Sequence, residues 1–406
     1  MRKIEAWGLL VIMMAAAVLR FSAVLLFPHQ PASDELAYLA MAESYIRGQG
    51  LVDSLGNFAF YNAGYPMFVL IPAAHIFGDL VVGARFANVI LGVVAVALCY
   101  LIARAISLGV WGRLSAAAIY AVYLPAGVYS VYVVKESLLT FLILLLVYCI
   151  IKLSRHNRIS YSLLAAVVVA GIALVGNAGL SLLASLIVGV CFSKAALMRR
   201  AGTLIGIGAL SVIMLLPWIQ RNQILVGAPV LNTNGGFNFY LGNNPNATGY
   251  FMSVADTPIG DEWQKMRAEL GEFRASSALK EKAIEWIVEN PAQFAGLAFK
   301  KAVYFWWPPL HDGDGSGGGV EKVVRLLWFI QFIILIAFAI VSIFVDWPSD
   351  KDKLLFWLML FSYTGVHMLF YVIYRYREPI MPVAAICAAV SLDSLLSRYW
   401  KGYPGV

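Results

Sequence analysis

The chain has 406 residues, of which 61% are hydrophobic and only 13% are charged. A soluble protein typically carries about a quarter charged residues, and the mean hydropathy of +0.77 exceeds what one water-facing core could bury. The apolar residues form runs of roughly 20, long enough to cross about 30 Å of hydrocarbon as helices. This composition predicts an all-α, multi-pass membrane protein and excludes a soluble enzyme.

The net charge of +7 does not indicate a nucleic-acid partner. The basic residues are spread among the loops instead of forming one patch, so we expect membrane lipids and no nucleic acid as partners. The four cysteines all fall inside apolar runs, where neither a CxxC metal site nor a loop disulfide is expected.

Ten apolar runs are candidate transmembrane helices. They cover residues 7–27, 80–103, 112–130, 137–152, 160–176, 179–193, 202–219, 324–345, 354–374 and 379–397.

The distribution of basic residues predicts the orientation of these helices. With the N-terminus inside, the inner segments hold 14 of the 30 basic residues, and the short opposite segments hold six. This bias predicts that both termini are cytoplasmic.

Three parts follow from this topology. Residues 1–219 form an N-terminal transmembrane module that contains the first outer segment (28–79). Residues 220–323 form the second outer segment, which is periplasmic in the predicted orientation, and residues 324–406 form a C-terminal transmembrane module. Within the outer segments we expect an interfacial helix over 35–47 and helices over 261–290 and 291–306.

Two carboxylate sites stand next to apolar runs. Asp34-Glu35 follows the first helix, and Lys135-Glu136 precedes the fourth. A carboxylate in such a place can act as a general base, so Asp34, Glu35 and Glu136 are candidate catalytic residues. The alternatives are a helix cap at Ser33 or Asp34 and a mutually neutralised Lys135-Glu136 pair.

Arginines lie at the outer ends of later helices, where the positive-inside bias disfavours them. Arg221-Asn222 follows the seventh helix, and Arg375 and Arg377 lie among tyrosines before the tenth. Arginine binds phosphate through two parallel hydrogen bonds, which suits a lipid phosphate at the outer interface. Anchoring to lipid head groups is the alternative.

A turn-rich stretch over 232–249 carries paired glycines and the amides Asn243 and Asn244. We expect it to close over the site with Tyr61 and Tyr65 and to bind substrate hydroxyls, although an ordered structural turn would have the same composition. A short acidic fragment around His311, with Asp312 and Asp314, is a weak metal-site signal. The metal requirement therefore stays open, with a divalent ion allowed and no cofactor required.

Taken together, these motifs resemble the GT-C integral-membrane glycosyltransferases, in particular the bacterial branch related to protein O-mannosyltransferases and to the lipid A aminoarabinose transferase. The resemblance rests on seven motifs in order along the chain: Asp34-Glu35-x-x-Tyr38, Tyr65-Pro66, Lys135-Glu136-Ser137-Leu138, Pro217-Trp218-x-x-Arg221-Asn222, the glycine- and asparagine-rich stretch 233–249, Asn290-Pro291 before Trp306-Trp307-Pro308, and Arg375-Tyr376-Arg377-x-Pro379.

The resemblance implies a transferase of the bacterial inner membrane. It would move a sugar from a polyprenyl-phosphate carrier to an acceptor hydroxyl on a glycan, lipid or protein at the periplasmic face, with inversion. Asp34 would be the base, with Glu35 and Glu136 as supporting acids. Arg221, Arg375, Arg377 and Lys135 would bind the donor phosphate, and Tyr61, Tyr65, Asn222, Asn243 and Asn244 would contact substrate.

Two departures from the family pattern narrow this expectation. The chain has Gly176-Asn177-Ala178-Gly179 where many relatives have Arg-Pro, and the Lys-Pro of the lipid A branch is missing near Asn62. These differences argue against the aminoarabinose activity. An O-antigen-type polymerase or ligase and a polytopic transporter or flippase remain alternatives. A transporter would place its polar residues near mid-membrane, whereas here they collect at helix ends.

Overall fold

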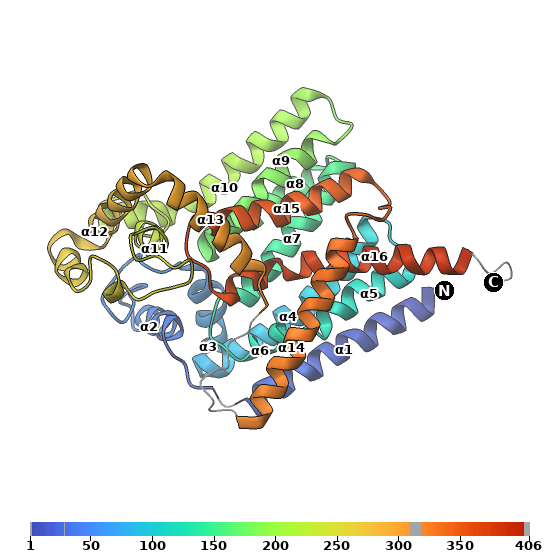
Figure 1. Ribbon diagram of the computed structural model, residues 1–406, viewed down its shortest axis with the longest axis horizontal. Coiled ribbons are helices and arrows are strands. Elements are labelled where there is room, and N and C mark those ends of the chain that lie inside the picture. The colour runs from blue at the N-terminus through green and yellow to red at the C-terminus, as the bar shows by residue number, and fades with distance from the viewer. Residues whose placement is uncertain (1, 28, 309–317, 402–406) are drawn as a thin grey trace.

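The computed structural model describes residues 2–27, 29–308 and 318–401 (Figure 1). Within these ranges every named secondary-structure element is a helix, and one isolated parallel bridge joins Tyr250 to Val372. This confirms the all-α prediction. The first ten elements are α1 (Arg2–Leu26), α2 (Asp34–Ile46), η1 (Pro66–Leu70), α3 (Ile71–Phe77), α4 (Leu80–Ala105), α5 (Val110–Ala121), α6 (Leu124–Val128), α7 (Glu136–Arg155), α8 (Ile159–Val175) and η2 (Asn177–Leu182). The others are α9 (Leu183–Cys191), α10 (Leu197–Val226), α11 (Gly235–Gly242), η3 (Val254–Asp256), α12 (Glu262–Glu289), α13 (Pro291–Trp306), α14 (Gly318–Val341), α15 (Asp350–Met368), η4 (Tyr374–Ile380) and α16 (Met381–Lys401).

Six helical segments in the described part of the chain are long and apolar enough to cross a membrane. They are Glu5–Leu26, Leu80–Ala105, Glu136–Arg155, Leu197–Val226, Glu321–Val341 and Tyr374–Ser397. The other four predicted spans correspond to shorter or more polar elements, so the total of ten stays a prediction. The six long apolar helices agree with the predicted multi-pass membrane protein.

The predicted span 112–130 is wrong as a single helix. It divides into α5 and α6, because Pro125 stands in the first turn of α6, where a proline is accommodated and a continuous helix is not. The carbonyls of Tyr120 and Ala121 at the end of α5 accept hydrogen bonds from the buried guanidinium of Arg20. A cation at this point suits the negative end of the helix dipole.

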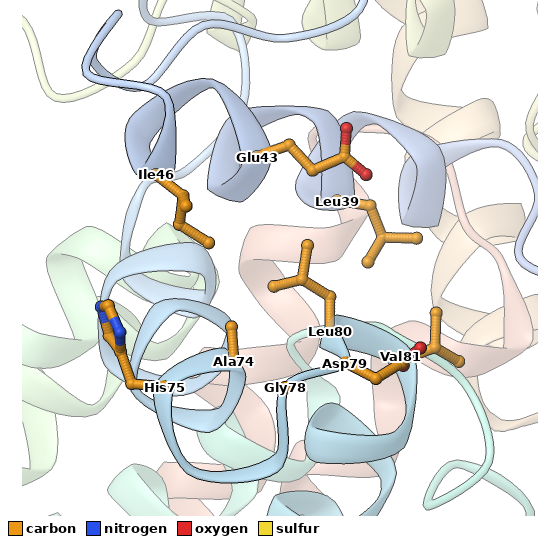
Figure 2. Close-up of a pocket in the computed structure, with 9 residues that line it drawn as sticks. All are labelled: Leu39, Glu43, Ile46, Ala74, His75, Gly78, Asp79, Leu80 and Val81. Atoms are coloured by element: carbon orange, nitrogen blue, oxygen red, sulfur yellow. The ribbon is translucent and has the colours of Figure 1, made fainter.

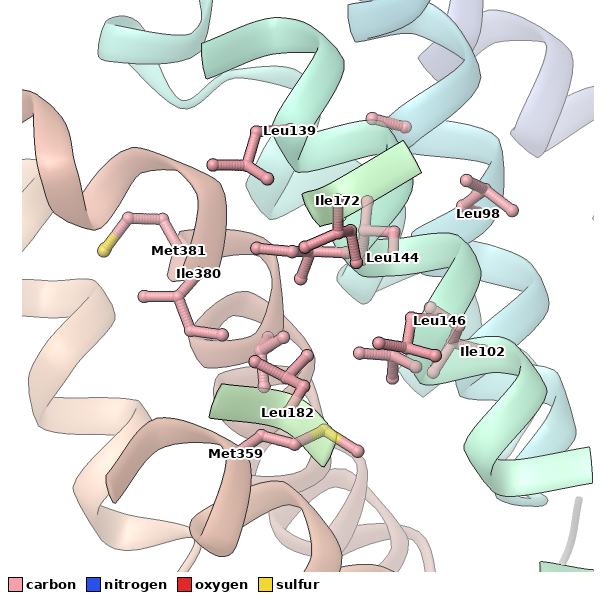
Figure 3. Close-up of a cluster of buried hydrophobic side chains, with 14 of the residues drawn as sticks. Leu98, Ile102, Leu139, Leu144, Leu146, Ile172, Leu182, Met359, Ile380 and Met381 are labelled. Carbon is pink, nitrogen blue, oxygen red and sulfur yellow. The ribbon is translucent and has the colours of Figure 1, made fainter. Parts of the chain in front are cut away.

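The core of the membrane part is built around α7 and α16. The apolar stretch of α7 is 67% buried and that of the segment containing α16 is 72% buried, compared with 17% for α1 and for α14. Leucines of α7 pack against α4 and α8, and Figure 3 shows them in one buried cluster with Met359 of α15, Ile380 of η4 and Met381 of α16. The peripheral helices leave apolar side chains exposed, as expected for surfaces that face lipid.

The polar elements gather at one end of the molecule. Figure 1 shows α2, α11 and α12 together there, whereas α1 begins and α16 ends at the opposite end. The helices expected over 35–47, 261–290 and 291–306 are α2, α12 and α13. The apolar pair η1 and α3 in the first outer segment was not predicted.

The contact between α11 and α12 depends on the absence of a side chain at Gly236. A Cβ atom there would lie 2.0 Å from the carbonyl oxygen of Ser276 on α12, and the backbone N–H of Phe237 donates to the Ser276 hydroxyl at 3.0 Å. The adjacent Gly235 has open space around it.

We therefore expect Gly236→Ala to push α11 off α12 and to destabilise the protein by about 1–3 kcal/mol, the usual cost of overpacking. Gly235→Ala is the matched control and should be neutral or slightly stabilising. Thermal unfolding of both variants in detergent checks this. Equal melting temperatures for the two variants would contradict it.

Candidate active site

Three segments far apart in the sequence bring charged side chains together. Arg375, on the 3-10 turn η4, forms an ion pair and a hydrogen bond with the Asp34 carboxylate at the start of α2. Its Nε atom also lies 3.4 Å from Oε1 of Glu136, the first residue of α7. One guanidinium therefore bridges two of the predicted catalytic carboxylates.

Asp34 is the more exposed of the two carboxylates in this group. Its side chain is 28% exposed, whereas that of Glu136 is 4% exposed. A general base must come within hydrogen-bond distance of the proton that it removes. Accessibility therefore makes Asp34 the better candidate for a general base and gives Glu136 an inner position.

Glu35 has a different environment from its neighbour. Its buried carboxylate lies 2.6 Å from His29 and accepts backbone N–H groups from Ala32 and Val133, at 3.1 and 2.6 Å. Val133 lies just before α7, so Glu35 fixes the start of α2 relative to the start of α7. It holds the site together instead of entering it.

The backbone before Asp34 is unusual. Ser33 has a φ of 51°, in the region that L-residues rarely adopt, and its side chain makes no capping hydrogen bond to α2. The predicted alternative of a serine cap is therefore wrong. Strained backbone of this kind costs of order 1–3 kcal/mol and concentrates at functional sites.

A cavity of about 200 Å³ opens beside the ion-pair cluster. Lys135 and Glu136 line it together with Tyr376, which follows Arg375. Burial lowers the pKa of Lys135, although the adjacent Glu136 carboxylate raises it in part. Five amide side chains line the same cavity, which we call the amide cavity: Asn62, Asn177, Asn232, Asn234 and Asn238.

Tyr61 lies at the edge of this group. Burial raises the pKa of its hydroxyl, and so does the nearby Asp34 carboxylate. Its ring meets that of Tyr38, one turn after Asp34 on α2, edge to face at 5.8 Å. Tyr61 therefore lies close to Asp34, and its predicted contact with substrate stays a prediction.

None of the three predicted phosphate-binding arginines lines the amide cavity. Arg375 pairs with the carboxylates beside it, whereas Arg377 and Arg221 make other contacts. Arg377 is fully buried, donates to the carbonyls of Phe305 and Trp307, and lies over the Phe332 ring. These contacts fasten η4 to the end of α13 and to α14. They leave Arg375 and Lys135 as the cations beside the two carboxylates.

Arg221 is also used by the chain itself. Its guanidinium donates to the carbonyls of Leu51 and Phe58 and lies 4.4 Å above the Trp218 ring. Arg221 thus connects the first outer segment to α10. Its guanidinium is used inside the protein, and it does not line the amide cavity.

The predicted substrate-binding amides are bonded to backbone. Asn222 donates to the Val230 carbonyl, Asn243 to Phe239 and Leu369, and Asn244 to Tyr240. All three are buried, as is Tyr65, whose hydroxyl donates to Asn88. None of these four residues lines the amide cavity. Their hydrogen bonds stabilise the local turns and helices instead.

Lys301 of α13 is a buried basic residue that was not predicted from the sequence. Its ammonium donates to the Asn243 side chain at 2.9 Å, and burial lowers its pKa to about 8. Lys301 thereby connects α13 to the turn after α11.

Glu272 connects the second outer segment to the first. Its Oε1 atom accepts the Ala59 N–H at 3.0 Å, and Oε2 is buried without a hydrogen-bond partner. Burial raises the pKa of Glu272 to about 7. Because the folded chain holds this proton more tightly, the stabilisation is present below about pH 4.5 and is lost as the pH rises through about 7.

We expect Glu272→Gln to remove this loss, since glutamine can still accept from Ala59 but cannot ionise. The melting temperature of the variant relative to the parent should rise between about pH 5 and about pH 8. Glu269→Gln, an exposed change on the same helix, should show no such trend. A pH-independent difference for Glu272→Gln would contradict the assignment.

A second hollow shares none of its lining residues with the amide cavity. This larger hollow of about 410 Å³ lies between α2 and α3 with the start of α4, and Figure 2 shows its lining of leucine, isoleucine, His75 and Glu43. In the part of the chain that the structure describes, no group of three or more potential ligand side chains is placed to hold a metal ion. The fragment with His311, Asp312 and Asp314 lies outside the described residues.

The family model for dolichyl-phosphate-mannose-protein mannosyltransferases matches residues 11–223, which is more than half of the chain. The chain belongs to this family. The match contains Asp34, Lys135 and Glu136, and it ends before Arg375. This membership agrees with the resemblance to GT-C glycosyltransferases that the sequence motifs indicated. No curated protein matches the chain by sequence.

The chain is also similar in fold to several solved structures. The oligosaccharyltransferase AglB from the archaeon Archaeoglobus fulgidus, in complex with an inhibitory peptide and a dolichol-phosphate, is 13% identical and has a TM-score of 0.55 over 98% of this chain. Its apo form is 14% identical with a TM-score of 0.56 over 97%. The chain spans about half of those proteins, 52% and 51%. The S. cerevisiae protein O-mannosyltransferase complex Pmt1-Pmt2 is 17% identical, with a TM-score of 0.44 over 59% of this chain and 36% of its own.

Proposed function

We propose that this family member transfers a sugar from a polyprenyl-phosphate-type carrier to an acceptor hydroxyl. The observation that carries the proposal is the bridging of Asp34 and Glu136 by Arg375 beside the amide cavity. A base, a phosphate-binding cation and a sugar-sized space are the three elements that this reaction needs. The archaeal structural relative was solved with a dolichol-phosphate, which supports a lipid-phosphate donor.

In the proposed step, the acceptor oxygen attacks C1 of the sugar while Asp34 takes the hydroxyl proton. The bond between C1 and the phosphate oxygen breaks, and its electron pair leaves with the carrier phosphate. Arg375 and Lys135 stabilise the negative charge of that leaving group. Attack from the face opposite the phosphate inverts the anomeric centre.

The donor phosphate also changes the state of the base. The Asp34 carboxylate is paired with Arg375 in the structure. A phosphate arriving at Arg375 competes for the same guanidinium, because both anions suit its fork of N–H donors. Asp34 is then free to accept a proton.

We further propose the bacterial inner membrane as the location, with both termini cytoplasmic and the site on the periplasmic face. The excess of basic residues in the inner loops supports this orientation, and so does the placing of α2, α11 and α12 at one end of the molecule. Labelling of single cysteines introduced into α12 and near residue 194, with a membrane-impermeant reagent on intact cells, tests it.

The activity is tested with purified protein, polyprenyl-phosphate mannose radiolabelled in the sugar, and peptide, lipid and glycan acceptors offered separately. Mannose is the first sugar to test because it appears in the family's description. Transfer of label to one acceptor, with inverted configuration in the product, is expected. Label that stays on the carrier while it crosses a vesicle membrane would indicate a flippase instead.

A further inference from the structure

We propose that the amide cavity is the subsite for the sugar ring of the lipid-linked donor, and that its asparagines bind the sugar hydroxyls. This inference rests on the proposed function and adds which residues recognise the sugar. The five amides come from the first outer segment, from the start of η2, and from α11 with the turn before it. They meet only in the folded chain.

The amides of the cavity differ from Asn222, Asn243 and Asn244 in having side-chain N–H groups that are not used in hydrogen bonds to backbone carbonyls in the described ranges of the chain. Asn222, Asn243 and Asn244 use their side-chain N–H groups on backbone carbonyls. By contrast, the Nδ2 atom of Asn232 is buried without a hydrogen-bond partner among the described residues. Buried polar groups in a native structure are almost always paired, so an unpaired amide donor in a cavity wall is available to a polar group that enters the cavity.

Asn238 is oriented by a chain of hydroxyl groups. The Tyr376 hydroxyl donates to Tyr371 at 3.1 Å, and the Tyr371 hydroxyl donates to the Asn238 side-chain oxygen at 3.4 Å. This leaves the NH₂ group of Asn238 to donate elsewhere. Asn234 lies four residues earlier, at the N-cap of α11, and lines the cavity together with Asn238.

The chemistry of the lining matches a hydroxyl-rich ring. Each asparagine offers two donors and an acceptor, and a sugar hydroxyl both donates and accepts. The 200 Å³ of space is far more than the roughly 10–15 Å³ that one water needs, so a group much larger than water can enter. Aromatic side chains, Tyr363, Phe370 and Tyr371, complete the wall, as is common in small-molecule sites.

The position of the cavity selects the donor sugar over the acceptor. Lys135 and Glu136 belong to its wall, and Glu136 pairs with Arg375, the proposed phosphate ligand. A sugar in the cavity would thus be joined to a phosphate at Arg375, with C1 between the two groups and close to Asp34.

The test compares binding of two lipids to the full chain in nanodiscs: polyprenyl-phosphate mannose and the same polyprenyl phosphate without sugar. Asn232→Ala and Asn234→Ala should each weaken binding of the first lipid roughly 3- to 10-fold, the value of one neutral hydrogen bond. Binding of the second should stay within about twofold. Neither side chain has a hydrogen-bond partner in the described part of the chain, so melting temperatures should also be unchanged.

The matched control is Asn246→Ala, in the same segment but outside the cavity lining. It should leave both affinities at the parental value. Equal affinities in parent and alanine variants for the mannosylated lipid would overturn the sugar subsite while leaving the proposed function intact. A rise in the acceptor KM with donor binding unchanged would also overturn it. Failure of the parent to bind either lipid would overturn the proposed function itself.

Discussion

Asp34→Asn should reduce transfer by roughly 10²- to 10⁴-fold, the usual effect of removing a general base. The substitution keeps the shape of the side chain and one acceptor oxygen for Arg375, so the fold should be retained. Turnover with saturating donor and acceptor is the measurement, and melting temperature reports on the fold.

Glu43→Gln is the matched control, because Glu43 lies on the same helix with a half-exposed side chain paired only to Arg47. It should leave turnover unchanged. Near-parental turnover in Asp34→Asn would show that the base is another group, and Glu136, on the other side of Arg375, would be the next to test.

Arg375 and Arg377, two residues apart, should give opposite results. Arg375→Ala should weaken binding of a polyprenyl-phosphate donor roughly 10- to 100-fold, as expected for loss of charge-assisted hydrogen bonds. Arg375→Lys should recover part of the affinity, since it keeps the charge without the planar fork.

Arg377→Ala should instead destabilise the protein by roughly 2–5 kcal/mol, because it leaves the carbonyls of Phe305 and Trp307 without their donor inside the protein. At temperatures where the variant remains folded, its donor affinity should be close to that of the parent. Titration of donor and thermal unfolding separate the two effects. A specific loss of donor affinity in Arg377→Ala, with parental stability, would reverse the assignment.

The sequence was informative where local pattern determines structure. Burying charge in hydrocarbon is costly, so charged residues at the ends of apolar runs are easily recognised in a sequence. Asp34, Glu136 and Arg375 were singled out in this way. Amphipathic periodicity likewise located α2, α12 and α13. The break between α5 and α6 was missed because Pro125 lies within an otherwise continuous apolar run.

The sequence could not separate residues whose roles depend on direction. Arg375 and Arg377 lie on a 3-10 turn with about three residues per turn, so they point to different sides. One reaches α2 and the other α13. The same limit applies to the amides: Asn243 and Asn234 look alike in a turn-rich segment, but only the fold shows which one is bonded to backbone and which one lines the cavity.

The fastening of residues 51–59 has a consequence for how the molecule unfolds. Arg221 holds the carbonyls of Leu51 and Phe58, Glu272 holds the Ala59 N–H, and Thr233 donates its own N–H to the Ala59 carbonyl. Segments separated by more than 150 residues of chain therefore share backbone hydrogen bonds that break together. The two outer segments should behave as one cooperative unit in native-state hydrogen exchange, with a common opening free energy, although the chain passes through the membrane several times between them.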